Sequence, residues 1–524
     1  MPVTVSYPGV YIEEIPSGVR SITGVATSIA AFVGQAARGP VNTPVTITSY
    51  ADFERIFGGL WINSRLGYAI QNFYQNGGST SIIVRIVHAA DAAQATIALP
   101  GGPPTLLAAS AGAWGNALHA VVDSQVSAAV ATQFGLATSD LFNLSVRDFN
   151  TGVTEVYRNL TVKNSPRRID KVLPIESTLV VSTGALTSVP TANNPPAAGK
   201  TIWTDSSANT AATTGSGQDG SPLVENDYVG PGLDAAKQGL YALRNTDLFN
   251  ILCIPPYSGA GFVDVDADLV GKAATFCEER RAMLLVDPPS SWTTVAQALA
   301  GIGSLGTNSA NAAVFFPRIM EADPLHNNVQ DTYVPCGAVA GIFARTDAQR
   351  GVWKAPAGID ATLTGVSQLS LNMTDLENGE LNPVGINCLR TFAAAGRVVW
   401  GSRTLQGDDR LASQWKYIPI RRLTLFIEES LYRGTQWVVF EPNDAPLWAQ
   451  IRLNVGAFMQ TLFRQGAFQG TSAQQAYFVK CDSETTTPTD QNNGIVNILV
   501  GFAPLKPAEF VIIQIQQMAA QAGQ

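Results

Sequence analysis

Charged side chains are scarce in this sequence. They make up 14% of its 524 residues, whereas soluble domains average about 25%. Either partners cover much of the surface, or Ser, Thr, Asn and Gly coat it. The formal net charge of −8 argues against a nucleic-acid-binding protein, which would carry a basic excess. Residues 385–524 are slightly basic, which suits either an acidic protein partner or ordinary scatter of surface charge.

Patterns for disulfides, secretion and membrane insertion are also missing. The five cysteines are odd in number and widely spaced, so we expect buried free thiols and not a disulfide framework. The first residues lack the basic start and apolar core of a signal peptide. No apolar run approaches the ~18 residues that a membrane span needs. We therefore expect a protein made in the cytoplasm, without direct membrane insertion.

Motifs for catalysis and cofactor binding are incomplete. Residues 301–306 match Gly-x-Gly-x-x-Gly, but they follow a predicted helix, whereas a dinucleotide site needs a strand before the glycines and a helix after them. Asp264, Asp266 and Asp268 imitate a calcium loop, but Leu269 stands where its glycine is needed. The three histidines are too scattered for a metal or triad set. We predict no enzyme, cofactor or metal; a cytosolic α/β enzyme with a site formed by distant residues is the alternative.

Strand and helix patterns alternate in two stretches of the chain. This order predicts a mixed α/β fold with a largely parallel sheet. Ser49 is placed to cap the first helix. The expected strands are 25–34, 81–87, 249–255, 282–287 and 312–317, and the expected helices are 49–57, 66–75, 266–281 and 293–299.

Changes in composition and pattern along the sequence predict several domains. Short β-type runs dominate residues 91–224, which we expect to be an inserted β-rich outer domain, with 183–222 as an exposed loop or flexible insertion. Two helices are predicted near the C-terminus, at 421–433 and 445–464. The expected parts are an extended arm (1–22), a discontinuous α/β core (23–90 and 225–389), the insertion, an inner domain (390–505) and a C-terminal arm (506–524).

Both ends of the chain have strand patterns without a local partner. Apolar residues alternate near the start, and a β-rich run stands close to the end. Termini fray unless something pairs with them, so these segments are expected to join a sheet elsewhere. The residues concerned are Val3, Val5, Tyr7, Val10 and Ile12 at the N-terminus, and Phe510, Val511, Ile512, Ile513 and Ile515 at the C-terminus.

Short segments spread over most of the chain form a recognisable set. They are residues 7–14, 38–40, 114–116, 334–356, 386–390, 398–404, 417–429, 440–443 and 507–512. Together they resemble contractile phage tail sheath proteins and the sheaths of related contractile injection systems. Cys336 departs mildly from that pattern, and the likeness is weakest at 183–222.

The resemblance implies a structural subunit that forms a helical stack of hexameric rings. The subunits would surround an inner tail tube protein, meet baseplate and tail terminator proteins, and contract to drive the tube through a target cell envelope. The terminal arms would add strands to the sheets of neighbouring subunits. Such a protein is made in the bacterial cytoplasm and then joins a virion tail or another contractile particle. A non-contractile shell or tube protein is a further alternative.

The slightly basic C-terminal region suggests where such a sheath would hold its tube. Exposed charge pairs contribute about 0–1 kcal/mol each, which suits a reversible grip repeated many times. The tube-facing candidates are Lys416, Arg421, Arg422, Arg452 and Arg464. The alternative is that these charges are solvated or pair within the chain, as Glu429 with Arg433 would.

Overall fold

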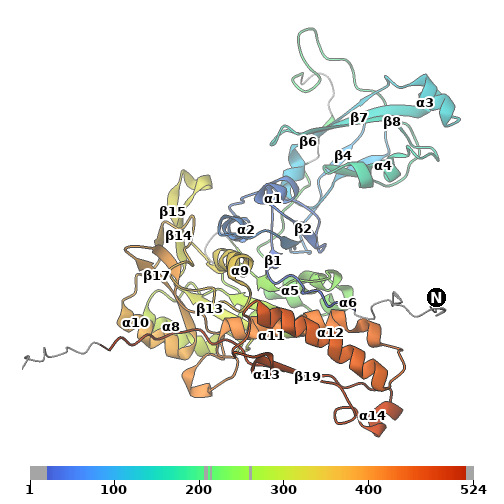
Figure 1. The fold of residues 1–524 in the computed structure, drawn as a ribbon. Helices are drawn as coiled ribbons and strands as arrows, with labels where there is room; N and C mark the ends of the chain where they lie inside the picture. Colours follow the sequence, from blue (N-terminus) through green and yellow to red (C-terminus); the bar gives the residue numbers. More distant parts are fainter. Residues whose placement is uncertain (1–19, 206–210, 213–214, 259–262, 515–524) are drawn as a thin grey trace, which may run out of the picture.

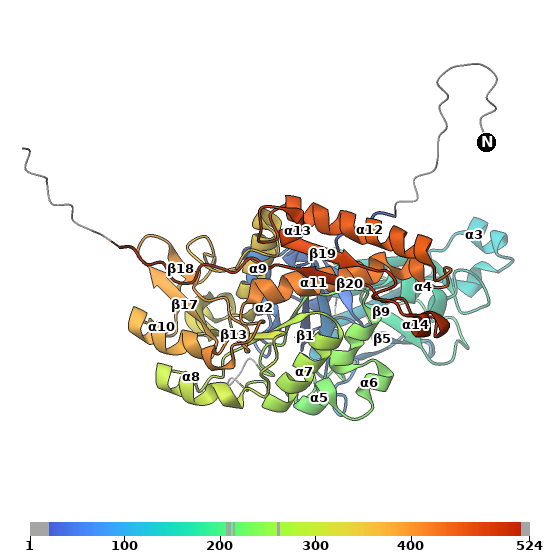
Figure 2. The same cartoon turned by 60° about the horizontal axis from the view of Figure 1, so that its bottom comes forward.

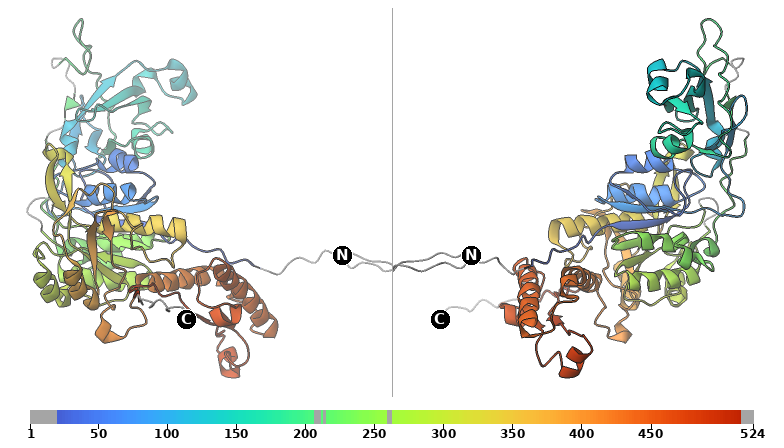
Figure 3. Two further views of the ribbon diagram at one scale, coloured as in Figure 1. Left: turned by 60° about the vertical axis from the view of Figure 1, so that its left-hand side comes forward. Right: turned by 90° about the vertical axis from the view of Figure 1, so that its right-hand side faces the viewer.

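The computed structural model describes residues 20–205, 211–212, 215–258 and 263–514. A mixed α/β body occupies the centre of the molecule (Figure 1). The described residues of 96–205 form a β-rich part at one end, and the C-terminal helices form the other end (Figure 3). The predicted mixed α/β class with a largely parallel sheet is confirmed.

The body is built on an eight-stranded sheet in the order β18-β17-β13-β12-β11-β1-β3-β2. The six inner strands run parallel, and the edge strands β2 and β18 are antiparallel to their neighbours. The buried apolar runs of the inner strands are typical of a sheet covered on both faces. The bounds are β1 Ala30–Gly34, β2 Val45–Ile47, β3 Ser81–Arg85, β11 Ile251–Cys253, β12 Met283–Val286, β13 Ala312–Phe316, β17 Ile386–Phe392 and β18 Gly396–Val399.

Helices cover both faces of this sheet. Alternate strand residues enter two separate cores: Phe32 faces one, and Ala31 and Val33 face the other. The helices of the first core are α1 Tyr50–Phe57, α2 Leu66–Gln75 and α9 Cys336–Arg350, and those of the second include α5 Glu225–Val229, α7 Ala267–Glu279, α8 Val295–Gly301 and α10 Asp375–Leu381. The predicted Ser49 cap is confirmed, since its hydroxyl accepts from the Asp52 backbone N–H at 3.2 Å.

Helices α2 and α9 pack unusually close together. A Cβ atom added at Gly337 would lie 1.9 Å from the carbonyl oxygen of Ala69, and one at Gly341 would lie 2.5 Å from that of Phe73. Only glycine fits at such an approach. The two helices therefore form one rigid layer of the body.

Strands β4 to β10 form two further antiparallel sheets around a separate core. One has the order β10-β6-β7-β8, and the other β4-β5-β9. The bounds are β4 Thr96–Ala98, β5 Thr105–Ala108, β6 Leu118–Asp123, β7 Leu141–Asp148, β8 Thr154–Thr161, β9 Val180–Thr183 and β10 Ala211–Ala212, with helices α3 Ala128–Gln133 and α4 Ile169–Glu176.

The described parts of the segment 183–222 have little regular structure, but several of them are tied to these sheets. The Thr191 N–H donates to the Pro100 carbonyl at 2.7 Å, and the Asn193 side chain accepts from the Val122 N–H at 2.8 Å. The side chain of Asn116 exchanges two hydrogen bonds of 2.9 Å with the backbone of Gly217. Side-chain amides thus anchor a segment with few apolar residues, and its place on the outside of an assembly stays a prediction.

The C-terminal region contains two long helices and a two-stranded sheet. Both predicted helices are confirmed: α11 is Ile418–Gly434 and α12 is Ala445–Arg464. Asp444 caps α12 by accepting from the Leu447 N–H at 3.0 Å. Strands β19 (Tyr477–Lys480) and β20 (Leu499–Phe502) lie alongside these helices (Figure 2).

The remaining elements are shorter. A three-stranded sheet, in the order β15-β14-β16, projects from the body (Figure 1). Its strands are β14 Ile319–Asp323, β15 Val329–Tyr333 and β16 Gln368–Leu369, and the remaining helices are α6 Leu233–Ala236, α13 Ala473–Ala476 and α14 Pro488–Asn492. In the described ranges, no helix is both long and apolar enough to cross a bilayer. All five cysteines are buried free thiols.

Candidate assembly site at the C-terminal arm

The C-terminal arm, residues 506–524, is described as far as residue 514 and leaves the body without joining a sheet (Figure 1). Four successive apolar residues of this arm, Phe510–Ile513, are 74–84% exposed. A soluble monomer rarely exposes such a run, and a run of this kind marks an interaction site. Over the described part of the arm, residues 506–514, the expected strand is not formed.

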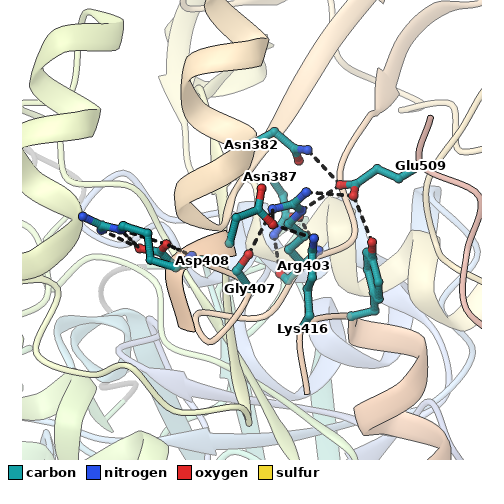
Figure 4. A network of polar contacts seen from close by, with 10 residues as sticks. Asn382, Asn387, Arg403, Gly407, Asp408, Lys416 and Glu509 are labelled. Carbon is teal, nitrogen blue, oxygen red and sulfur yellow. Dashed lines mark hydrogen bonds and ion pairs between the residues drawn. The ribbon is translucent and has the colours of Figure 1, made fainter. Parts of the chain in front are cut away.

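One carboxylate fixes the base of this arm to the body (Figure 4). Glu509 accepts two parallel hydrogen bonds of 2.7 Å from the Arg403 guanidinium. Tyr417 donates its hydroxyl at 3.0 Å, and Asn382 donates its amide at 2.8 Å. We call these four residues the Glu509 clamp. A two-pronged pair of this geometry fixes both position and direction.

The charges around the clamp are balanced within the chain. The Arg403 side chain is only 1% exposed, and it also donates to the Gly407 carbonyl and to Asp409, each at 3.0 Å. Lys416 pairs with the same Asp409 carboxylate at 2.6 Å. Burial raises the pKa of Glu509, but the bonds from Arg403, Asn382 and Tyr417 outweigh it and hold that pKa below its usual value. The clamp is therefore closed when Glu509 is ionised.

The β19–β20 ribbon has room for additional strands. Its two strands pair only with each other among the named strands of the described chain. A sheet of two strands is marginal in water, and this ribbon is supported by packing on α12, with Tyr477, Val479 and Val500 against the core of the C-terminal region. Phe478 and Leu499 are 48% and 52% exposed.

A cleft of about 870 Å³ lies between the arm and the body. Leu505 and residues 506–511 of the arm line it on one side. Trp353, Lys354 and Trp400 belong to the opposite walls, and the clamp residues Asn382 and Tyr417 also line it. The arm thus leaves the body beside a hollow that an isolated chain does not fill.

Only part of the predicted strand set can be located. Val3, Val5, Tyr7, Val10, Ile12 and Ile515 lie outside the described residues. The other four, Phe510, Val511, Ile512 and Ile513, stand exposed on the C-terminal arm. Their pairing with another subunit stays a prediction.

Two of the tube-facing candidates are turned into the protein. The Arg422 side chain is 3% exposed and pairs with Asp347 at 2.7 Å, so the expectation of a tube-facing charge is wrong for Arg422. Arg421 is 15% exposed, donates to Asn311 at 2.8 Å and lies over the Trp415 ring. Both arginines face inward because α11 is packed between the body and α12, and residue spacing alone could not show this.

The other three tube-facing candidates differ in exposure and in their contacts within the chain. Lys416 is engaged by Asp409 next to the clamp. Arg452 is half-buried and donates to the Cys481 carbonyl, whereas Arg464 is exposed in the last turn of α12. The expected intrachain pair of Glu429 with Arg433 is present at 2.7 Å.

Sequence reasoning missed the clamp itself. Glu509 was visible as a lone carboxylate at the start of an apolar run, which is a usable signal for an anchor. Arg403, Tyr417 and Asn382 gave no such signal, because they lie up to 127 positions away in the sequence. The Gly-x-Gly-x-x-Gly segment follows α8 and leads through a short 3-10 turn toward β13, so the strand–glycine–helix order is missing there.

An exposed apolar arm clamped at its base, in a chain that also has a two-stranded ribbon, is typical of one class of protein: a structural subunit that forms polymers. Comparison with known families agrees with this class. The phage tail sheath protein central domain matches residues 231–405, and the phage tail sheath C-terminal domain matches residues 412–518. Together they cover more than half of the chain, which belongs to the phage tail sheath family, a family of structural proteins.

Individual relatives and solved structures support the assignment. The tail sheath protein of Burkholderia phage BcepMu is 25% identical over 485 residues, covering 89% of this chain and 88% of its own. That of Enterobacteria phage T4 is 25% identical over 225 residues, or 41% of this chain and 31% of its own.

The same fold is found in solved sheath structures. The sheath of an extracellular contractile injection system, PVC, in its contracted state has a TM-score of 0.58 at 21% identity, covering 99% of this chain and 100% of its own. A sheath tail protein from Listeria innocua has a TM-score of 0.59 at 14% identity, covering 93% and 96%. The chain is a structural subunit of a tail sheath.

Proposed function

We propose that this chain polymerises with itself into a helical stack of rings around an inner tube and shortens to drive that tube through a cell envelope. Its partners would be copies of itself, the tube protein, and the baseplate and terminator proteins at the two ends. The helical sheath of the anti-feeding prophage, solved in a contracted state, shares the fold with a TM-score of 0.55 at 22% identity, covering 98% of this chain and 100% of its own. In this proposal the chain catalyses no reaction.

The terminal arms would link the subunits by adding strands to a neighbour's sheet. The observation that carries this is the apolar run Phe510–Ile513, exposed beyond the Glu509 clamp. The β19–β20 ribbon is the receiving sheet we favour, because both of its strands have an outer edge free of other named strands. Backbone hydrogen bonds would supply the connection, and alternating side chains would set the register.

The energy for shortening would be stored when the sheath assembles. Two packings of the same subunits, with the shorter one lower in free energy, need no nucleotide or cofactor at the moment of firing. Arms fixed at a clamped base would keep neighbours connected while the rigid bodies turn. The α/β body, with its close α2–α9 contact, suits such rigid-body motion.

The inner wall would hold the tube through exposed basic residues of the C-terminal region. Of the candidates, Arg464 is exposed to solvent, and Arg452 is half-buried. Reversing both charges, with Arg464→Glu and Arg452→Glu, should weaken co-assembly with the tube protein and leave tube-free polymers unchanged. Unaltered co-assembly would remove these two residues from the tube contact.

The arm linkage is tested by ending the chain after Glu509. This truncation keeps the clamp, and the described residues that it removes, 510–514, are all exposed, so the melting temperature of the monomer should stay within about 1–2 °C of wild type, as for other surface changes. Negative-stain microscopy should then show no long cylinders. A matched control, truncated after Ala520, should still polymerise. Full-length cylinders from the shorter chain would refute the linkage.

A further inference from the structure

Phe440 is more exposed than any other large apolar residue in the described ranges, at 102% of its reference area. It lies in the loop between α11 and α12, and its backbone φ is +70°. Residues with a Cβ rarely adopt this left-handed region, and a bulky aromatic there is strained. No part of the described chain covers this ring, so its apolar surface faces solvent.

The loop that carries Phe440 is held firmly in place. The Asn443 side chain donates to the Ile495 carbonyl at 2.9 Å and accepts from the Trp448 indole N–H at 2.8 Å. Gln491 donates to the Asn443 carbonyl at 3.0 Å. A strained residue that its surroundings hold in position is characteristic of functional sites. The loop that presents the ring to solvent is thus anchored three residues further on, at Asn443.

The N-terminal arm leaves the body at the same corner. The guanidinium of Arg20 lies 4.7 Å from the centre of the Trp437 ring and 4.0 Å from the Glu441 carboxylate. The Arg20 N–H also donates to the Asn454 side chain at 3.2 Å. Residues 437 and 441 flank Phe440, so the described chain begins, at Arg20, in the same loop region as this ring.

We propose that Phe440 is a docking anchor for a second copy of this chain, the copy that receives the N-terminal arm. The inference rests on the proposed arm exchange, because a neighbour that takes the arm must lie close to the corner from which the arm departs. A rigid aromatic side chain buries a large area and loses little conformational freedom on binding. In this proposal Phe440 holds the α/β bodies of two neighbouring subunits together, and the N-terminal arm links their sheets.

Substitutions at Phe440 separate docking from folding. Phe440→Ala should raise the protein concentration needed for cylinders at least tenfold in a sedimentation assay. Phe440→Gly should do the same while the melting temperature of the monomer stays equal or rises, because glycine relieves the left-handed backbone. The matched control is Ile175→Ala on α4, which removes an 86% exposed apolar side chain far from this corner and should leave assembly unchanged.

A photo-crosslinking amino acid at position 440 identifies the partner in assembled full-length cylinders. Crosslinks to a peptide of a second copy support the proposal, whereas crosslinks confined to the same chain or to the tube protein overturn it. Wild-type assembly by Phe440→Ala and Phe440→Gly would also overturn it. Deleting residues 1–12 tests the arm exchange separately: cylinders lost on that deletion but kept on Phe440→Ala would refute only the docking role.

Discussion

Glu509 lies where the chain passes from its own body to the exposed arm. Replacing it by glutamine removes the charge that faces Arg403, and charged hydrogen bonds contribute about 1.5–3 kcal/mol. We expect Glu509→Gln to lower the free energy of unfolding by about 2 kcal/mol and to reduce cylinder formation. The matched change Glu428→Gln affects a 42% exposed carboxylate 3.8 Å from Arg421 and should cost under about 1 kcal/mol.

The same residue gives the clamp a pH dependence. The pKa of Glu509 is held below its usual value of 4.5 in the folded protein, because its bonds to the clamp outweigh the effect of burial. Its contribution to stability is therefore complete above pH 4.5 and is lost as the pH falls through the lower, folded value. Urea unfolding between pH 7 and pH 3 should show this loss in the wild type and a smaller one in Glu509→Gln.

Arg422 is a structural residue. Its guanidinium makes bonds of 2.8 and 2.7 Å to Asp347, which also accepts from Thr27 at 2.7 Å. Removing one partner of a buried pair leaves an uncompensated charge, at a cost of about 3–5 kcal/mol. Asp347→Asn should lower the urea midpoint accordingly. Glu484→Gln, in a pair whose side chains are 54% and 81% exposed, should change it little, and equal effects would contradict the assignment.

The C-terminal arm is the element whose proposed role depends on its backbone. An added strand bonds to its neighbour through every second N–H, and proline has none. Of Val511→Pro and Ile512→Pro, one should therefore impair cylinder assembly more than the other. The monomer should melt unchanged in both, because these residues are 80% and 84% exposed. Ile512→Val is the control and should assemble; equal tolerance of both prolines would argue against a strand.

Elements differ in how well their sequences predicted them. Helix α12 has a cap at Asp444, a proline in its first turn and an apolar stripe, and its bounds were predicted correctly. Helix α9 is buried on nearly every side over Cys336–Ala344, so its sequence lacks the period that marks a surface helix. The β19–β20 ribbon was not predicted, because short strands depend on the partner they meet.

The whole molecule has its β-rich part at the end away from α11 and α12 (Figure 3). We propose that this part forms the outer surface of the sheath. Limited proteolysis of assembled cylinders should then cut within residues 183–222, since exposed segments with little regular structure are preferred cleavage sites. Monomers provide the control for intrinsic susceptibility. Protection of this segment in cylinders but not in monomers would place it at a subunit contact instead.

The sequence by itself determined the elements whose cause is local. Alternating strand and helix patterns, the caps at Ser49 and Asp444, and the apolar character of the last strand-like run are all properties of neighbouring residues. Only the tertiary structure decided which charged side chains are exposed and which form buried ion pairs within the chain. Arg403 joins Glu509 across 106 positions and Arg422 joins Asp347 across 75, and a pairing across such distances in sequence follows from how the helices and strands pack.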